Sequence, residues 1–202
     1  MESGRYLDST FFIDCDSEAI KEKAQELIEG VGDPIERAKR LFYFARDGIK
    51  YNVYAPKDSA EDFRASATLV RGEGYCVQKA VLFVALARAG GIPARLGFAM
   101  IRNNLLPLKL FEIMKTTILP WHGYARLFLN KRWVKATPAF DKGMCEEHRI
   151  IPVEFDGVSN ASFHSHNKDG QLHIEYLKDR GSFDDVPLDQ IQEALRERGL
   201  IS

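Results

Sequence analysis

The sequence lacks long apolar runs, an excess of charge of either sign, and an even set of cysteines. No segment approaches the roughly 18 consecutive apolar residues of a membrane-spanning helix. The 28 Lys and Arg against 29 Asp and Glu give a net charge of −1, which removes the usual electrostatic reason to expect nucleic acid or an anionic membrane as partner. Three cysteines in 202 residues argue against a disulfide framework, so at least one thiol is free and must serve packing or chemistry.

Targeting signals and linkers are also scarce. The opening residues, MESGRY, contain no basic patch that leads into an apolar stretch, so they do not predict a secretory signal. There is no internal repeat, and no linker rich in Pro, Gly or Ser divides the chain. We therefore expect one domain over residues 1–202 in a reducing, cytoplasmic setting, without a nucleic-acid or membrane partner. The oligomeric state stays open.

The first half of the sequence has a helical period. Apolar residues recur on one face over residues 20–28, and a second helix is expected from Asp33-Pro34 to Gly48, because Asp can cap a helix and Pro suits its first turn. A short helical piece is expected at 66–70. The glycine-containing segment 72–74 then leads into an apolar helix over 76–89.

The second half changes to the period of strands. Strands are expected at 94–101, 122–129 and 132–137, the last two joined by a tight connection at Asn130-Lys131, and another at 172–177. Residues 188–198 predict a closing amphipathic helix. The stretch 103–120 is ambiguous: it either caps a groove or packs on the core, and we favour packing. Helices followed by an antiparallel sheet indicate the α+β class.

Cys76 is the most informative residue, because it stands where a glycine-flanked loop becomes a helix. The unpaired N–H groups of a helix start carry partial positive charge, which should lower the pKa of the thiol and could also hold the oxyanion of a tetrahedral intermediate. The alternative is that Cys76 only packs the start of a buried helix, since free cysteine is often buried. A thiol nucleophile needs a base, and His122, which opens a predicted strand, is the candidate.

Two blocks of sequence resemble the transglutaminase-like superfamily, which shares a papain-like cysteine-protease core. They are GEGYCVQKAVLFVALARAGGIPAR and WHGYARLFLNKRWVKATPAFD. Segments further downstream, around residues 154–157 and 174–187, resemble a bacterial subgroup of short, stand-alone members. The resemblance implies N-terminal helices, with the nucleophile at a helix N-terminus, packed on an antiparallel sheet. It also implies that Cys76 is the nucleophile and His122 the general base.

The third position of the family's triad departs from the pattern. The family normally has an Asp directly before a Pro on the return strand, whereas this chain has Thr137-Pro138. An orienting carboxylate fixes the imidazole tautomer and stabilises the imidazolium, and Thr137 offers no charge. Asp141, four residues later, is the speculative substitute. Loss of the orienting member alone usually costs less than loss of nucleophile or base, so reduced activity remains compatible with the sequence.

Other residues near the two blocks invite further roles. Tyr51 and Tyr75 are candidates to assist the oxyanion through a phenolic O–H, although we favour ordinary packing for both. Gln78 and Lys79 follow the nucleophile in the first helical turn, and Lys79 reads as a solvated side chain. Cys15, between two aspartates, is expected to be structural or on the surface, because acidic neighbours disfavour a thiolate.

A zinc site is a third class of interpretation. The remaining histidines and one cysteine gather in the second half of the chain: Cys145, His148, His164, His166 and His173. Their spacings match no common zinc pattern, so we expect neither a metal nor a cofactor. No phosphate-binding loop is expected either, because the glycines at 72 and 74 lack the Lys-Ser/Thr that follows in a P-loop.

The sequence therefore predicts a cysteine-dependent acyl-group enzyme that acts on peptide or amide bonds through a thioacyl-enzyme. Hydrolysis is slightly favoured over transfer to an amine, because the chain is short and shows no obvious second module or calcium site. The alternative is a non-catalytic binding or interaction protein that keeps the fold. Thr137 is the feature that favours this alternative.

Overall fold

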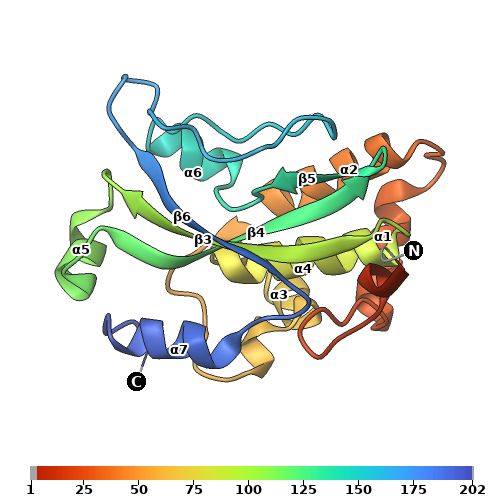
Figure 1. Cartoon of the computed structure of the whole chain (residues 1–202), viewed down its shortest axis with the longest axis horizontal. Helices are drawn as coiled ribbons and strands as arrows, with labels where there is room; N and C mark the ends of the chain where they lie inside the picture. Colours follow the sequence, from red (N-terminus) through yellow and green to blue (C-terminus); the bar gives the residue numbers. More distant parts are fainter. Residues whose placement is uncertain (1–3, 202) are drawn as a thin grey trace.

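The computed structural model describes residues 4–201, in which helices cover one side of a four-stranded antiparallel sheet (Figure 1). The sheet has the order β5-β4-β3-β6. Its strands are β3 (Ala94–Asn103), β4 (Ile118–Leu129), β5 (Arg132–Ala136) and β6 (Ile174–Phe183). A second, very short parallel sheet joins β1 (Lys50–Tyr51) to β2 (Glu73–Gly74), directly before the central helix.

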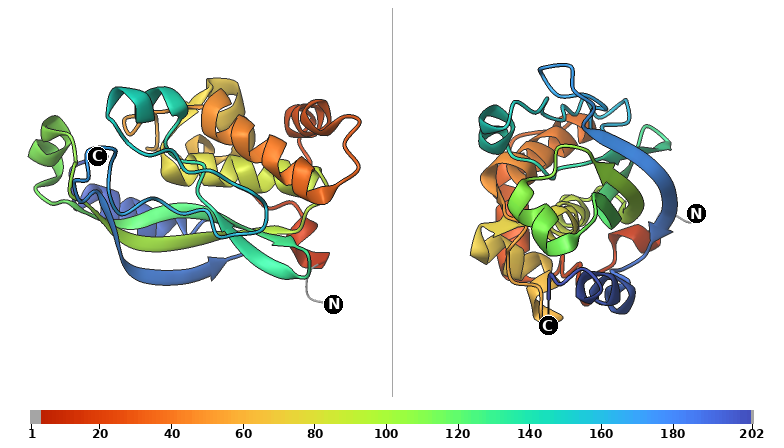
Figure 2. Two further views of the ribbon diagram at one scale, coloured as in Figure 1. Left: turned by 90° about the horizontal axis from the view of Figure 1, so that it is seen from above. Right: turned by 90° about the vertical axis from the view of Figure 1, so that its left-hand side faces the viewer.

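Seven α-helices and three shorter helical turns are present in the described part of the chain. The α-helices are α1 (Glu18–Ile28), α2 (Pro34–Tyr43), α3 (Ala65–Arg71), α4 (Cys76–Ala89), α5 (Leu108–Met114), α6 (Lys142–Glu147) and α7 (Leu188–Arg196). The turns are η1 (Gly4–Leu7), η2 (Phe44–Gly48) and η3 (Glu61–Phe63). The left view of Figure 2 shows α1 to α4 stacked on one face of the sheet. None of the described helices is both long and apolar enough to cross a membrane.

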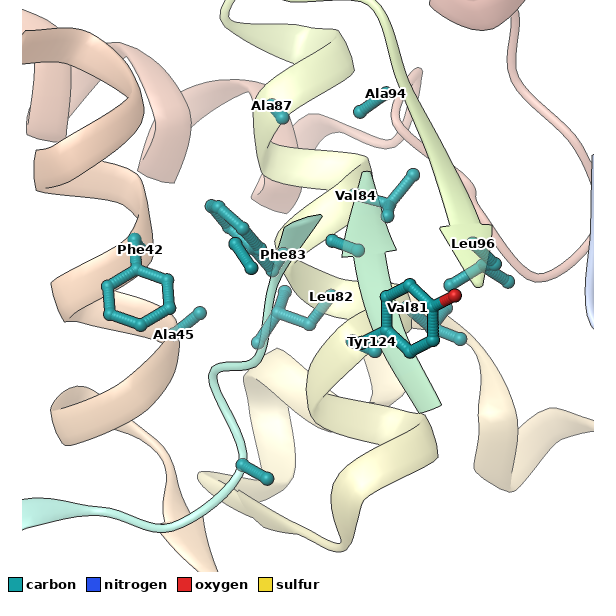
Figure 3. Packing of buried hydrophobic residues seen from close by; sticks show 14 of the residues in the cluster. Phe42, Ala45, Val81, Leu82, Phe83, Val84, Ala87, Ala94, Leu96 and Tyr124 are labelled. Atoms are coloured by element: carbon teal, nitrogen blue, oxygen red, sulfur yellow. The ribbon is translucent and has the colours of Figure 1, made fainter. Parts of the chain in front are cut away.

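Helix α4 is the centre of the hydrophobic core. Its residues from Val77 to Arg88 are all buried, which explains why its sequence is apolar around its whole circumference. Phe83 meets Phe42 of α2 at 5.7 Å between ring centroids. Figure 3 shows α4 between α2 on one side and the strand residues Leu96 and Tyr124 on the other. Burial between a helix layer and a sheet fixes the position of its first residue, Cys76.

The predicted elements are largely confirmed, and the expected α+β class is correct. The hairpin forms at Asn130-Lys131, where both residues adopt positive φ (48° and 64°), as a tight two-residue connection requires. The predicted second helix ends in the π-helical turn η2. The ambiguous stretch resolves into helix α5 followed by the start of β4. Helix α6 was not expected; Asp141 caps it by accepting a hydrogen bond from the Met144 N–H.

Candidate active site

Cys76 is the first residue of α4 and lines a cavity of about 840 Å³. The helix start is held by Gln78, which is fully buried. The Tyr75 N–H donates to Gln78 Oε1 at 3.2 Å, and Gln78 Nε2 donates to the carbonyls of Pro56 at 2.7 Å and Asp62 at 2.9 Å. These bonds tie the loop before α3 to the first turn of α4. The thiol itself is partly buried and faces the cavity.

Burial dominates the electrostatics of the thiol. The backbone N–H groups of Gly123, Val77 and Cys76 itself face the sulfur and lower its pKa, as a helix start should. Desolvation is the larger effect, and it raises the pKa of Cys76 to about 11. The expected net lowering of this pKa is therefore wrong. At neutral pH Cys76 rests as a thiol and needs a base to lose its proton.

His122 lines the same cavity as the thiol, and strand β4, which carries it, passes very close to the start of α4. A Cβ at Gly123 would stand 2.8 Å from the Val77 Cα, so only glycine permits this approach. The Gly123 N–H consequently faces the Cys76 sulfur, and the side chain of the preceding residue, His122, lines the same cavity. The strand thus brings the Gly123 N–H to the sulfur and an imidazole to the cavity that the thiol lines.

Aromatic rings, rather than a carboxylate, surround the imidazole. The His122 ring lies 4.8 Å from the Phe163 ring and 6.1 Å from the Tyr176 ring, centroid to centroid. Its side chain is 1% exposed, and burial lowers its pKa to about 3. Nε2 is buried and has no hydrogen-bond partner within residues 4–201. His122 therefore rests as a neutral imidazole.

Thr137, the residue at the family's third position, lies outside the lining of the cavity. It is 1% exposed, and its side chain hydrogen-bonds Tyr176, whose hydroxyl also accepts from the Phe163 N–H at 3.3 Å. Thr137 thus contacts one of the two rings that flank His122. This bond ties Thr137 to the ring packing around the base.

Asp141 lines the cavity but uses its carboxylate elsewhere. One oxygen accepts from the Tyr51 N–H at 2.7 Å, and the other accepts from the Met144 N–H at 2.9 Å. These bonds make Asp141 a link between β1 and the start of α6. Both of its oxygens serve backbone donors, which gives Asp141 a structural task whatever its relation to the imidazole.

The two tyrosines proposed as oxyanion aids both line the cavity. Burial, followed by the nearby Cys76, raises the pKa of each phenol well above its ordinary value, so both remain protonated donors. The Tyr51 ring packs edge-on against Phe140 at 4.9 Å. The Tyr75 hydroxyl is buried, with no partner in the described part of the chain. Both tyrosines are therefore packed in the fold and still carry a protonated phenol that is able to donate a hydrogen bond.

Lys79 is not the solvated side chain that its sequence position suggests. It is completely buried, and its Nζ donates to the carbonyls of Arg46, at 2.8 Å, and Ile49. Burial lowers its pKa to about 7, against the opposing charges of Asp141 and Asp47. The lysine fastens the end of η2 and the start of β1 to α4. The sequence could not reveal this role, because nothing in the apolar helix indicates that its lysine bonds the carbonyls of Arg46 and Ile49, which lie in a distant segment.

The residues considered for zinc are dispersed in the structure. Cys145 and His173 are buried, whereas His164 and His166 are exposed on a loop. The His173 ring stacks on Phe140 at 6.1 Å. Within residues 4–201 no group of three or more His, Cys, Asp or Glu is placed to hold a metal ion. Cys15 is buried, and burial raises its pKa, in agreement with a structural role.

Phe163 and Tyr176 are site residues that the sequence did not single out. Phe163 lies in the loop before β6, and Tyr176 lies on the predicted strand at 172–177. Neither residue stands at a diagnostic spacing from His122. Their proximity to it depends on the pairing of β6 with β3, which places Tyr176 opposite Ile101. A lone aromatic in a loop carries no signal of that pairing.

Similarities to solved structures concern the fold. One of them, described as "a Putative Cysteine Protease from Cytophaga hutchinsonii", is 14% identical with a TM-score of 0.53, over 89% of this chain and 46% of that one. Another, the periplasmic domain of TgpA from Pseudomonas aeruginosa, is 18% identical with a TM-score of 0.49, over 67% of this chain and 46% of that one. This chain thus spans less than half the length of either structure. No curated protein matches it significantly.

The sequence model of the transglutaminase-like superfamily matches residues 21–138, which is more than half of the chain. The matched region contains α4 with Cys76 and β4 with His122, and it ends at the Thr137-Pro138 dipeptide. The chain belongs to the transglutaminase-like superfamily.

Proposed function

We propose that this protein is a cysteine-dependent enzyme that cleaves peptide or amide bonds through a thioacyl intermediate. Membership of the superfamily supports cysteine-dependent acyl-group chemistry in general terms. The single observation that carries the finer proposal is the close approach of β4 to α4, which brings the thiol, an imidazole and converging N–H groups to one cavity.

The first half-reaction follows from the neutral resting states. The Cys76 sulfur attacks the amide carbonyl while its proton passes to His122, which is unprotonated and therefore able to accept it. The N–H groups around the sulfur are placed to stabilise the oxyanion as the carbonyl bond opens. Collapse of this intermediate breaks the C–N bond, and His122 returns the proton to the leaving amine. A thioester on Cys76 remains.

In the second half-reaction water is the nucleophile and the Cys76 sulfur is the leaving group. His122 takes a proton from water, the water oxygen bonds to the thioester carbonyl, and collapse breaks the C–S bond as the proton returns to sulfur. We favour water over an amine as acceptor, because a selective amine acceptor needs binding groups of its own, whereas water is abundant in any open cleft. The imidazolium of each step is costly in its aromatic surroundings, so the proposal predicts a slow enzyme.

One assay tests whether cleavage depends on Cys76 and His122 rather than on a contaminating protease. It also tests whether the acyl group passes to water or to an amine. Purified wild type, Cys76→Ala, His122→Ala and the control Cys15→Ala are assayed for release of soluble fluorescent peptides from labelled casein, with and without the fluorescent amine dansylcadaverine. Release by wild type and Cys15→Ala but not by the other two supports the proposal. Incorporation of the amine without release identifies transfer instead of hydrolysis.

The alternative is a non-catalytic binding protein with the same fold. The buried Nε2 of His122, without a partner in the described chain, and the raised pKa of Cys76 are the observations in its favour. Binding of peptides to wild type and Cys76→Ala with equal affinity, together with no turnover in either, would support this alternative over the enzyme.

A further inference from the structure

The cavity that contains the thiol has an apolar wall made by four elements. Two strands and two helices contribute six aliphatic side chains: Ile101 of β3, Leu110 and Met114 of α5, Leu119 of β4, and Ile191 and Leu195 of α7. The right view of Figure 2 places α5 in front of α4 seen end-on, with α7 below it. The interpretation that residues 103–120 only pack on the core is therefore wrong, because α5 also borders the site.

This wall is built into the fold. Leu110 and Met114 are each 5% exposed and Ile191 is 1% exposed, so they are held in place by their neighbours. Gln192 of α7 donates to the carbonyl of Asp58 at 3.2 Å, which fastens α7 to the loop that also contains the cavity-lining Lys57. The turn after α7 packs on α5, where Gly199 lies close to Ile113. Helix α7 lies beyond the part of the chain that matches the superfamily.

Most of the charged side chains that line the cavity come from other segments of the chain. Asp47, Lys50 and Lys57 come from the segment before α3, and Glu147 comes from α6. Arg198 follows α7 and donates to the Ala194 carbonyl at 3.0 Å and to Glu197 at 3.1 Å. The six side chains of the wall thus offer aliphatic contact area, and Arg198, at its α7 end, is the charged group that follows them in the chain. Such a surface gains free energy by covering an apolar group and selects against a charged one.

We infer that this wall is an acyl-side subsite for a bulky apolar side chain. The inference rests on the proposed function, because the thiol in the same cavity defines where the reacting carbonyl lies. The acyl half of the substrate stays bonded to Cys76 between the two half-reactions, so a cavity that includes the thiol holds that half. The substrate class is then a peptide or amide with a residue such as Phe or Leu on the carbonyl side of the cleaved bond.

The experiment measures labelling of Cys76 by chloromethyl ketones of N-acetylated Phe, Leu, Gly and Asp, with iodoacetamide as a probe that needs no subsite. Intact-mass and peptide analysis give the rate at Cys76. We expect the Phe and Leu probes to react about 10- to 100-fold faster than the Gly and Asp probes. Leu110→Trp should remove most of that ratio by filling the wall, with iodoacetamide labelling unchanged. Leu108→Trp is the matched control, since Leu108 is 71% exposed on the same helix and does not line the cavity.

The outcomes distinguish the two proposals. Equal rates for the four ketones, with iodoacetamide still modifying Cys76, would overturn the subsite and leave the nucleophile intact. If no probe modifies Cys76, the proposed function fails, and binding to the Cys76→Ala protein decides the subsite by itself. N-acetylphenylalaninamide must then bind at least tenfold more tightly than N-acetylglycinamide, and Leu110→Trp must abolish the difference; equal binding overturns the inference.

Discussion

Acid should destabilise this protein through the buried imidazole of His122. Burial lowers the pKa of this imidazole from 6.5 to about 3, so the unfolded chain takes up a proton more readily than the folded one. The stabilising neutral state is fully present above pH 6.5 and is lost as the pH falls towards 3. At about 1.4 kcal/mol per unit, His122 should remove about 2 kcal/mol of unfolding free energy between pH 8 and pH 5.

The assay is urea unfolding at pH 8, 6.5 and 5 for wild type and His122→Asn, which keeps a polar side chain but does not titrate. The free energy of wild type should fall about 2 kcal/mol further than that of the variant between pH 8 and 5. His164→Asn is the control and should follow wild type, because His164 is exposed. Parallel losses in wild type and His122→Asn would refute the account of a buried imidazole without a compensating charge.

Three further predictions concern Cys76, Thr137 and Lys79. Iodoacetamide should modify Cys76 about tenfold faster per pH unit from pH 7 to 10, since burial raises the thiol pKa to about 11; a plateau below pH 8 would contradict this. Thr137→Asp should increase turnover by adding a carboxylate beside Tyr176, whose ring flanks His122, and unchanged or lower kcat in a folded variant would contradict it. Lys79→Met should lower the unfolding free energy by about 1–3 kcal/mol in urea titrations, because two buried carbonyls lose their donor; no loss would argue against that role.

The local elements could be predicted because local chemistry determines them. Asp33 and Pro34 start α2, and the Asn130-Lys131 turn sets the register of β4 against β5. Cys76 and His122 were singled out for a related reason: Cys76 stands at a glycine-marked helix start, and His122 was predicted to open a strand, although β4 begins four residues earlier, at Ile118. The start of a helix or strand can be recognised from the types of residue there and from their spacing.

The environment of these two residues was less accessible to sequence analysis. The pKa of Cys76 depends on burial beneath distant segments, and burial outweighs the helix start that the sequence displays. The rings around His122 come from Phe163 and Tyr176, which are 41 and 54 residues downstream in the sequence and reach it through long-range packing. Asp141 was considered as an orienting acid, and only the fold shows that its oxygens accept from two backbone N–H groups. Non-local contacts of this kind leave no periodic pattern.

The role of Cys76 as nucleophile is tested most directly by intact-mass spectrometry of the protein mixed with the p-nitrophenyl ester of N-acetylphenylalanine and quenched in acid within seconds. An ester forms the thioester quickly, so the acyl-enzyme should accumulate if Cys76 is the nucleophile. We expect an added mass of one N-acetylphenylalanyl group, located on Cys76, absent from Cys76→Ala and strongly reduced in His122→Ala. Acylation elsewhere in the chain, or equal acylation of Cys76→Ala, would contradict it.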